Sequence, residues 1–179
     1  MRVFVGDITS VRDVDVIVNA ANGIGVMGAG VAGAIARSAG LSDSPNGVNI
    51  RKIVKEVVDN SGPFDVGDVY ISDSGLMKRL GVKKIYHAVT MKYPGGRTTI
   101  GTIGPLLRNV LETAISNGEK SVAFGGLGCG IGGLSKEEVA REMALVSQEY
   151  NGRISIHVVD MNEDFIEEFK KNLSVPIEM

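Results

Sequence analysis

Glycine is the residue type whose placement is most unusual in this chain. The 179 residues include 24 glycines, nearly double the ~7% typical of proteins. Five of them lie between residues 23 and 33, and six lie between residues 125 and 133. Because glycine weakens the interiors of helices and strands, two dense clusters indicate loops where the backbone turns tightly or approaches a ligand closely.

Both glycine clusters occur in the same predicted context. The first follows an apolar stretch at residues 16–20 and precedes a helical pattern near residues 31–38. The second follows residues 121–124 and precedes a helix that begins after Ser135. In open α/β sheets ligands bind at the carboxyl ends of strands, and unpaired amides at a helix N-terminus suit anionic oxygens. The sequence therefore predicts two loops that hold a diphosphate between them.

Other phosphate-binding and hydrolytic motifs are disfavoured because their partners are missing. Residues 23–28 and 28–33 both spell G-x-G-x-x-G, but no strand ending in Asp or Glu follows about 20 residues later, as a nicotinamide-binding fold requires. The sequence has no G-x-x-x-x-G-K-[ST] loop, and neither cluster contains a lysine. It also has no G-x-S-x-G or H-E-x-x-H motif. We therefore expect backbone amides to hold phosphates while any reaction occurs elsewhere on the ligand.

Three polar residues at predicted strand ends are candidates for ligand contact. The Asp7 carboxylate either accepts a hydrogen bond from an adenine amino group or caps the turn that follows it, and the residues alone favour the cap. Asn19 and Asn22 flank two alanines at the end of an apolar strand, where a buried unpaired amide costs roughly 1–3 kcal/mol. Since a spacing of three points them differently, we assign loop bracing to Asn19 and ligand contact to Asn22.

The other candidate nucleophile and base favour structural roles. Cys129 is the single cysteine, and its loop contains no basic residue to lower its pKa. We expect it to fill space rather than to react. His87 lies between Tyr86 and Ala88 in a predicted strand, as is typical of a hydrogen-bonded histidine in a protein core.

Predicted strands alternate with predicted helices along the chain. Apolar runs rich in β-branched residues predict strands at residues 2–5, 16–20, 68–72, 84–89, 121–124 and 153–159. Apolar residues at helical spacing predict helices near residues 31–38, 50–58, 106–115, 135–150 and 165–173. This alternation predicts an α/β sandwich with a mostly parallel sheet.

Composition narrows the class of protein. The chain has 19 Lys and Arg against 21 Asp and Glu, a net charge of −2, which disfavours a nucleic-acid partner. No apolar run reaches the roughly 18 residues of a membrane span, and the first ten residues lack a signal-peptide pattern. We therefore expect a cytoplasmic protein without a membrane partner. One cysteine and two histidines do not supply a Cys/His zinc cage, so no metal is expected.

Four motifs occur in a recognisable order along the chain. They are GDIT at residues 6–9, VIVNAAN at 16–22, MGAGVAGAI at 27–35 and FGGLGCGIGG at 124–133. In this order and at this spacing they resemble the macro domain family, and the resemblance covers essentially the whole chain. It implies one three-layer α/β/α domain over residues 1–179 with a central mixed, mostly parallel sheet.

The resemblance to macro domains implies an ADP-ribose pocket. Asp7 would receive the adenine amino group beside the backbone of Ile8, and Asn22 would face the distal ribose. The first loop would wrap that ribose and one phosphate with Gly28, Ala29, Gly30 and Val31. The second loop would hold the other phosphate with Gly128, Cys129, Gly130, Ile131 and Gly132.

Macro domains differ in what they do with this ligand. Some only bind ADP-ribose, whereas others hydrolyse ADP-ribosyl esters of Glu or Asp side chains or deacylate O-acetyl-ADP-ribose. We expect hydrolysis without metal or cofactor, with Asn22 as the catalytic residue that orients the distal ribose and a water. The expected partners are ADP-ribosylated proteins or acylated ADP-ribose. A non-catalytic ADP-ribose reader is the alternative.

Three positions depart from the family pattern that the resemblance brings. Ala32 stands where one group of hydrolases carries an Asp that helps to orient the attacking water. Gly132 stands where many relatives place Phe or Tyr over the distal ribose. Val159 aligns with an aromatic residue that often stacks on adenine, and Met161 and Phe165 are the candidates to cover the base in its place.

Overall fold

A six-stranded sheet forms the centre of the computed structural model, which describes residues 1–130 and 133–178. The strand order is β1-β6-β5-β2-β4-β3. Neighbouring strands run parallel except for β3, which runs antiparallel to β4 at one edge. The strands are β1 (Arg2–Val5), β2 (Val16–Asn22), β3 (Val69–Asp73), β4 (Lys84–Met91), β5 (Ser121–Phe124) and β6 (Ser155–Asp160).

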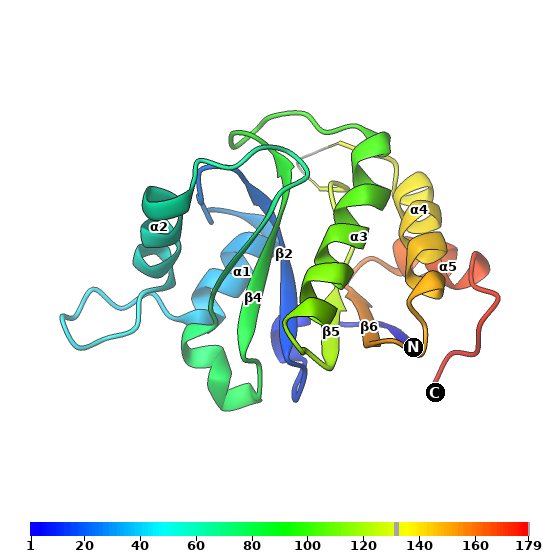
Figure 1. Ribbon diagram of the computed structural model, residues 1–179, viewed down its shortest axis with the longest axis horizontal. Helices are drawn as coiled ribbons and strands as arrows, with labels where there is room; N and C mark the ends of the chain where they lie inside the picture. The colour runs from blue at the N-terminus through cyan, green and yellow to red at the C-terminus, as the bar shows by residue number, and fades with distance from the viewer. Residues whose placement is uncertain (131–132, 179) are drawn as a thin grey trace.

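Helices cover both faces of the sheet, as Figure 1 shows. The α-helices are α1 (Gly30–Ala39), α2 (Ile50–Ser61), α3 (Ile100–Ser116), α4 (Lys136–Glu149) and α5 (Glu163–Lys171). Two short 3₁₀ helices, η1 (Ile8–Ser10) and η2 (Gly75–Leu80), follow β1 and β3. Because α1 and α2 pack on one face and α3 to α5 on the other, the predicted three-layer α/β/α sandwich with a mixed, mostly parallel sheet is confirmed.

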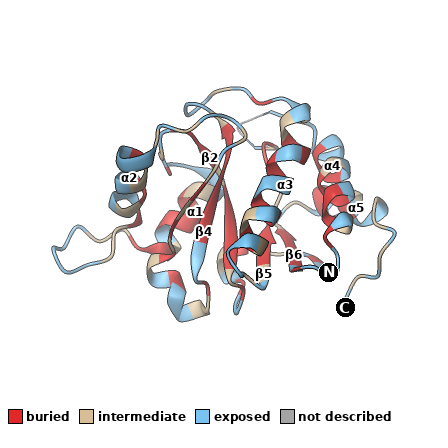
Figure 2. Ribbon diagram, viewed as in Figure 1, coloured by how far each residue is buried: buried red, intermediate tan, exposed pale blue. Residues whose placement is uncertain are grey.

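The core consists of two apolar clusters separated by the sheet. Side chains alternate along β2, so that Val16 and Val18 pack toward α3 while Ile17 packs toward α1. Figure 2 shows that the central strands are buried along most of their length, whereas the helices expose one side. This burial on both faces is why the strands read as continuous apolar runs in the sequence.

The observed elements differ from the predicted ones mainly at their ends. β2 continues to Asn22, and α3 begins at Ile100, six residues before its apolar stripe, with Pro105 inside the helix. The predicted start of α4 is confirmed, because the Ser135 hydroxyl accepts a hydrogen bond from the N–H of Glu138 at 3.4 Å. Helix ends depend on capping and tertiary contacts more than on apolar spacing.

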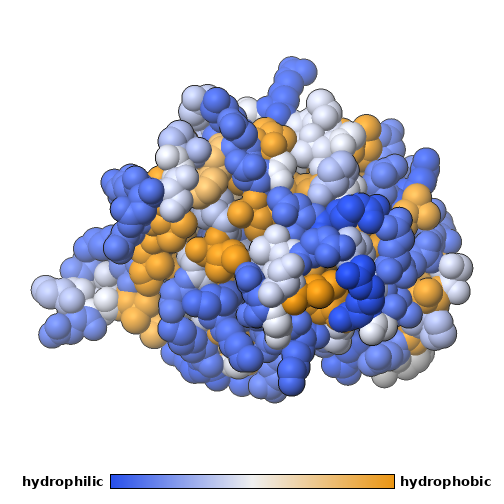
Figure 3. All heavy atoms as spheres, in the orientation of Figure 1, coloured by the Kyte–Doolittle hydropathy of each residue, from blue (hydrophilic) through white to orange (hydrophobic). Residues whose placement is uncertain are grey.

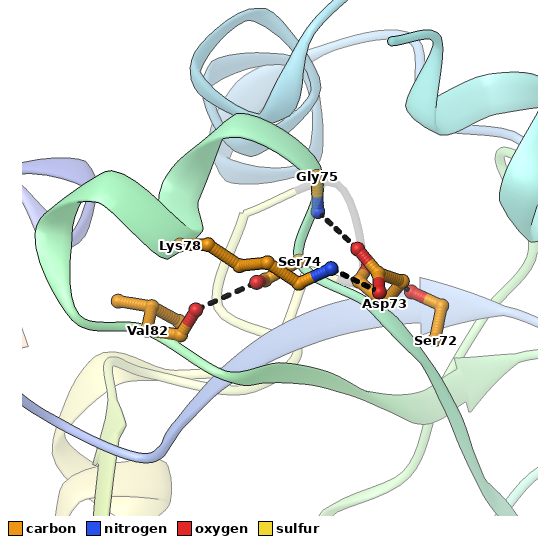
Figure 4. A network of polar contacts seen from close by, with 6 residues as sticks. All are labelled: Ser72, Asp73, Ser74, Gly75, Lys78 and Val82. Atoms are coloured by element: carbon orange, nitrogen blue, oxygen red, sulfur yellow. Dashed lines mark hydrogen bonds and ion pairs between the residues drawn. The ribbon is translucent and has the colours of Figure 1, made fainter.

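A polar network fixes the turn between β3 and β4, as Figure 4 shows. The Asp73 carboxylate accepts hydrogen bonds from the Gly75 N–H at 2.8 Å and from Lys78 Nζ at 2.5 Å. The Ser74 hydroxyl donates to the carbonyl of Val82 at 2.6 Å. A Cβ on Gly75 would lie 2.3 Å from the carbonyl oxygen of Ala39, so this turn packs tightly against the end of α1.

The surface in view is mostly hydrophilic, and its hydrophobic areas are small and separate (Figure 3). None of the helices within the described residues combines the length and the apolar character needed to cross a membrane. The two ends of the chain meet on one side of the molecule, where the Glu178 N–H donates to the carbonyl of Met1 at 2.9 Å.

His87 lies in the centre of β4 and is fully buried, which confirms its predicted place in the core. Its Nδ1 lies 3.1 Å from Asn19 Nδ2, and its Nε2 lies 2.8 Å from the Ser72 hydroxyl. The rings of Tyr70 and Phe64 stack outward from it, with centroid distances of 4.7 Å and then 4.5 Å. Burial favours the neutral form of the His87 imidazole, whose two ring nitrogens face the Asn19 amide and the Ser72 hydroxyl.

Acidification should destabilise the fold through His87. Burial lowers the pKa of His87 from 6.5 to about 3, so between these values the unfolded chain binds a proton that the folded chain does not. The free energy of unfolding therefore falls as the pH drops below about 6.5, by at most about 1.4 kcal/mol per pH unit. Between pH 7 and pH 5, the free energy of unfolding measured with denaturant should fall by about 2 kcal/mol more in the wild type than in His87→Gln. Equal losses would contradict a buried neutral imidazole.

Candidate functional site

Two adjoining cavities lie at the carboxyl ends of the parallel strands. Their volumes are about 490 Å³ and 290 Å³, and both are lined by Ala20, Gly30, Val31 and Gly126. Figure 1 shows that the segments after β4 and β5 lie together at this end of the sheet. Volumes of this size suit a small-molecule ligand, and the position is the one at which open α/β sheets bind ligands.

The first glycine loop is held by the side chain of Asn22, the last residue of β2. Its Oδ1 accepts hydrogen bonds from the N–H groups of Ile24 at 3.2 Å and Val26 at 3.1 Å. Its Nδ2 donates to the carbonyl of Val26 at 2.9 Å. Asn22 also lines the second cavity. One Nδ2 hydrogen is left for a further acceptor, so Asn22 braces the loop and has one donor for a ligand.

This result changes the division of roles expected for the two asparagines. Asn19, which was expected to brace the loop, instead contacts His87 in the core, and no hydrogen bond between its side chain and the first loop occurs among the described residues. Asn22, which was assigned to ligand contact alone, carries most of the loop bracing as well. Its contact with a ligand stays a prediction.

Residues from other elements donate hydrogen bonds to backbone carbonyls of the same loop. The Tyr70 hydroxyl donates to the carbonyl of Asn22 at 3.1 Å, and burial raises the pKa of this hydroxyl, which keeps it protonated. Arg51 of α2 donates to the carbonyl of Met27 at 3.2 Å. The Phe64 N–H donates to the carbonyl of Gly23 at 2.9 Å, and a Cβ on Gly23 would lie 1.9 Å from the Phe64 oxygen. Glycine is therefore required at position 23.

The first loop leads directly into the N-terminus of α1. Ala29 is the N-cap and makes no side-chain capping hydrogen bond. The first intrahelical bond runs from the N–H of Gly33 to the carbonyl of Ala29. The preceding N–H groups of the first turn have no intrahelical acceptor, and Gly30, Val31 and Ala32 line the second cavity. This helix end is therefore suited to an anion.

The second glycine loop is held by Asp160 at the end of β6. The Asp160 Oδ2 accepts from the N–H of Gly126 at 2.9 Å, and its Oδ1 accepts from Asn162 at 2.8 Å. Within the loop, the carbonyls of Gly128 and Gly130 accept hydrogen bonds from residues that follow them. Among the described residues, neither Gly128 nor Gly130 donates its own N–H. Both glycines line the second cavity.

At the far end of the first cavity lie Asp7 and Ile8, directly after β1. Asp7 caps η1, since its Oδ1 accepts from the Thr9 N–H at 2.9 Å and from the Thr9 hydroxyl at 2.7 Å. The predicted capping role is thus confirmed. The second carboxylate oxygen and the N–H of Ile8 make no hydrogen bond with any described residue. Together they present one acceptor and one donor to the cavity.

Charge is distributed unevenly between the two cavities. The ionisable residues that line the first are Asp7, Arg37 and Asp160. The described residues that line the second include no ionisable side chain. An anion in the second cavity would consequently meet backbone N–H groups and glycine, not lysine or arginine. No group of three or more His, Cys, Asp or Glu that could hold a metal ion occurs in the part of the chain described.

The structure brings most of the predicted site residues together. Asp7 and Ile8 line the first cavity, and Asn22, Gly28, Ala29, Gly128 and Gly130 line the second, while Gly30 and Val31 line both. Cys129 lies in the same loop but lines neither cavity. Ile131 and Gly132 lie outside the described residues.

Of the two residues proposed to cover an adenine, the structure favours Met161. Met161 lines the first cavity and is 74% exposed. Phe165 is 1% exposed, belongs to the core cluster under α3 to α5 and lines neither cavity. Phe165 therefore does not reach the cavity, because its position on α5 turns it inward, toward Phe169.

Sequence reasoning missed the residues that hold the two loops. Asp160 directly follows the strand predicted at residues 153–159, and a carboxylate at the end of a strand could have been recognised from the sequence as a candidate. Tyr70 and Arg51 come from distant parts of the chain, and nothing in the local sequence points to their contacts. Arg37 lies on the exposed side of α1, where an arginine is ordinarily a solvated surface residue.

The family of the chain follows from its sequence and its fold together. Residues 18–143 match the family model for the Macro domain, so the chain belongs to the macro domain family. An O-acetyl-ADP-ribose deacetylase of Klebsiella pneumoniae is 35% identical over 140 residues, which are 78% of this chain and 74% of that protein. A protein of Aquifex aeolicus is 34% identical over 98% of both chains.

Solved structures agree with this assignment. The Oceanobacillus iheyensis macrodomain with MES bound has a TM-score of 0.75 and 25% identity, covering 94% of this chain and 87% of that one. A point mutant of that macrodomain with ADPR has a TM-score of 0.76 and the same identity, covering 94% and 88%. These structures share the arrangement of sheet and helices described above.

The thiol of Cys129 should be unreactive in the folded protein. Burial, together with the nearby Asp160, raises the pKa of this thiol to about 12, so the reactive thiolate is scarce at neutral pH. Alkylation with iodoacetamide, followed by mass spectrometry, should be ~100-fold or more slower in the folded than in the denatured chain. Rapid labelling of the folded protein would contradict a partly buried thiol that stays protonated at neutral pH.

Proposed function

We propose that the protein binds ADP-ribose and hydrolyses an ester attached to its distal ribose, either O-acetyl-ADP-ribose or an ADP-ribosylated Glu or Asp side chain. One observation carries the proposal: the two glycine loops and the N-terminus of α1 line one cavity, in which the described residues carry no ionisable side chain, and this cavity adjoins another one that is lined by Asp7. A relative that is 35% identical is named O-acetyl-ADP-ribose deacetylase, and a macrodomain of similar structure was solved with ADPR.

The adenine would lie at the Asp7 end of the first cavity. Adenine presents an amino donor beside a ring-nitrogen acceptor. The second oxygen of Asp7 and the N–H of Ile8 provide the complementary acceptor and donor. A hydrogen bond to an ionised carboxylate is about twice as strong as a neutral one, so Asp7 would contribute both affinity and selectivity for the base.

The diphosphate would lie between the two loops, where none of the described residues that line the second cavity has a cationic side chain. Backbone N–H groups of Gly30 and Val31 on one side and of Gly128 and Gly130 on the other would donate to its oxygens. The dipole of α1 adds to this attraction. Because these donors are fixed by the fold, the phosphates are positioned without chemistry at phosphorus.

The distal ribose would then lie beside Asn22. In deacetylation, a water attacks the acetyl carbonyl and the bond between that carbon and the ribose oxygen breaks. One proton of the water passes to the ribose oxygen and the other is released to solvent, so that the products are ADP-ribose, acetate and a proton. The remaining Nδ2 hydrogen of Asn22 would orient the ribose or the water, and a ligand phosphate would assist proton removal. Positioning would supply most of the rate enhancement.

A non-catalytic ADP-ribose reader is the second candidate function. The absence of an ionisable side chain among the described residues of the second cavity favours it, because general acid–base groups are then lacking. Ala32 occupies the first turn of α1 where a carboxylate would face this cavity. Incubation with O-acetyl-ADP-ribose and with a mono-ADP-ribosylated glutamate peptide separates the two functions. A reader would bind ADP-ribose in calorimetry and release none above the protein-free control.

Substituting Gly130 with Val should abolish ADP-ribose binding in calorimetry without unfolding the protein. A Cβ at Gly130 meets no described atom within 4 Å, so the fold accepts the side chain while the phosphate loses its space. Gly101→Val is a matched control, since Gly101 is exposed, also has open space and lines neither cavity. Unchanged affinity in Gly130→Val, with melting like wild type, would place the phosphates elsewhere.

Turnover should depend on Asn22 more than binding does. Asn22→Ala should reduce ester hydrolysis by ~100-fold or more, as loss of a preorganised polar group does, with a smaller loss of ADP-ribose affinity. Asn22→Asp keeps an acceptor for the N–H groups of Ile24 and Val26 but loses the amide donor, and it should be similarly slow. Ala32→Asp should raise the rate if water orientation limits it. Full activity of Asn22→Asp would show that the amide donor of Asn22 takes no part in the reaction.

A further inference from the structure

None of the described residues that line the first cavity is aromatic, although nucleotide sites commonly stack the base on an aromatic ring. Val159, at the end of β6, lines this cavity but is small and almost completely buried. Met161 lines it as well, but a flexible thioether orders a base less well than an aromatic ring does. The search for a stacking residue therefore turns to the neighbouring strand, β1.

We propose that Phe4 of β1 stacks on the nucleobase and thereby makes the site selective for nucleotides over phosphorylated sugars that have no base. This inference rests on the proposed function, because it takes the ligand to be an adenine nucleotide. It adds a specificity-determining residue from a strand that the family resemblance did not point to.

The register of the sheet places Phe4 beside the position where an aromatic residue is missing. β1 pairs in parallel with β6, and Phe4 is the direct partner of Val159. Partnered residues on neighbouring strands project to the same face of a sheet. The ring of Phe4 therefore lies on the face to which Val159 projects, one strand further toward the edge.

Gly6 allows this ring to extend toward the ligand end of the sheet. A Cβ on Gly6 would lie 3.3 Å from Cε2 of Phe4 and 3.4 Å from a methyl carbon of Val159. The ring of Phe4 thus extends along the strand toward residue 6 and would contact a side chain there. Gly6 and Val159 both line the first cavity, so the ring abuts its wall next to Asp7.

The exposure of Phe4 fits a binding role better than a core role. Phe4 is 40% exposed and lies against Gly6, which lines the first cavity, and Met161 is 74% exposed and lines the same cavity itself. Exposed large apolar groups gathered at a cavity commonly mark a binding surface. A base that entered between them would cover both side chains, while Asp7 and Ile8 paired with its polar edge.

A single tryptophan gives a direct test, because the chain contains none. The emission of Phe4→Trp should be quenched on titration with ADP-ribose and with AMP, at the midpoint found by calorimetry, and should not change with ribose 5-phosphate, which has no base. Leu145→Trp is the matched control, since Leu145 is 46% exposed on α4 and lines neither cavity. Equal quenching in both variants, or none in Phe4→Trp at saturating ADP-ribose, would overturn the assignment.

Affinity provides the second measurement. Phe4→Ala should weaken binding of ADP-ribose and AMP by about tenfold, within the range that loss of base–aromatic stacking produces, and should leave ribose 5-phosphate binding unchanged. Phe4→Tyr should bind like wild type. Wild-type affinity in Phe4→Ala would overturn this inference alone. Failure of the wild-type protein to bind ADP-ribose would overturn the proposed function, and with it this inference.

Discussion

The candidate site depends on the side-chain amide of one buried residue, Asn22. This amide accepts two hydrogen bonds from the backbone of the first glycine loop and donates one to it. The glycines of that loop have no side chains that could pack and hold it in place. Its position then determines where α1 begins and which N–H groups face the cavity. Tyr70 and Arg51 fix the same loop through its carbonyls. A flexible sequence is in this way held in one conformation by polar groups on rigid elements.

The second loop follows the same principle with a carboxylate in place of an amide. Asp160 ends β6 and holds the N–H of Gly126, at the end of the adjacent strand β5. Each loop is thus fixed by a polar residue at a strand terminus, and the distance between the loops is set by the spacing of strands in the sheet. The sheet therefore sets the distance between the two groups of residues that would contact a ligand, and this distance limits the length of ligand that can contact both.

Much of this architecture was predictable from the sequence. Strand β5 and the N-cap Ser135 agree with prediction, because apolar runs and capping residues are local signals. The start of α3 at Ile100 was not predicted, because Pro105 and two glycines in its first turns interrupt the apolar spacing that indicates a helix. In the site, the loops and Asp7 could be found from glycine spacing and strand ends. The contacts of Tyr70 and the register of Phe4 with Val159 could not, because they join segments far apart in the chain.

A wall of main-chain donors also has a consequence for how the sequence changes over time. Every residue type except proline carries the same N–H group, so most substitutions in and around such loops keep the donors while altering the side chains between them. Selection then acts on backbone shape at a few glycines and on the residues that anchor the loops. Other surface positions can accept substitutions without loss of these donors. Preserved architecture at 25% identity to the Oceanobacillus iheyensis macrodomain is the outcome this freedom allows.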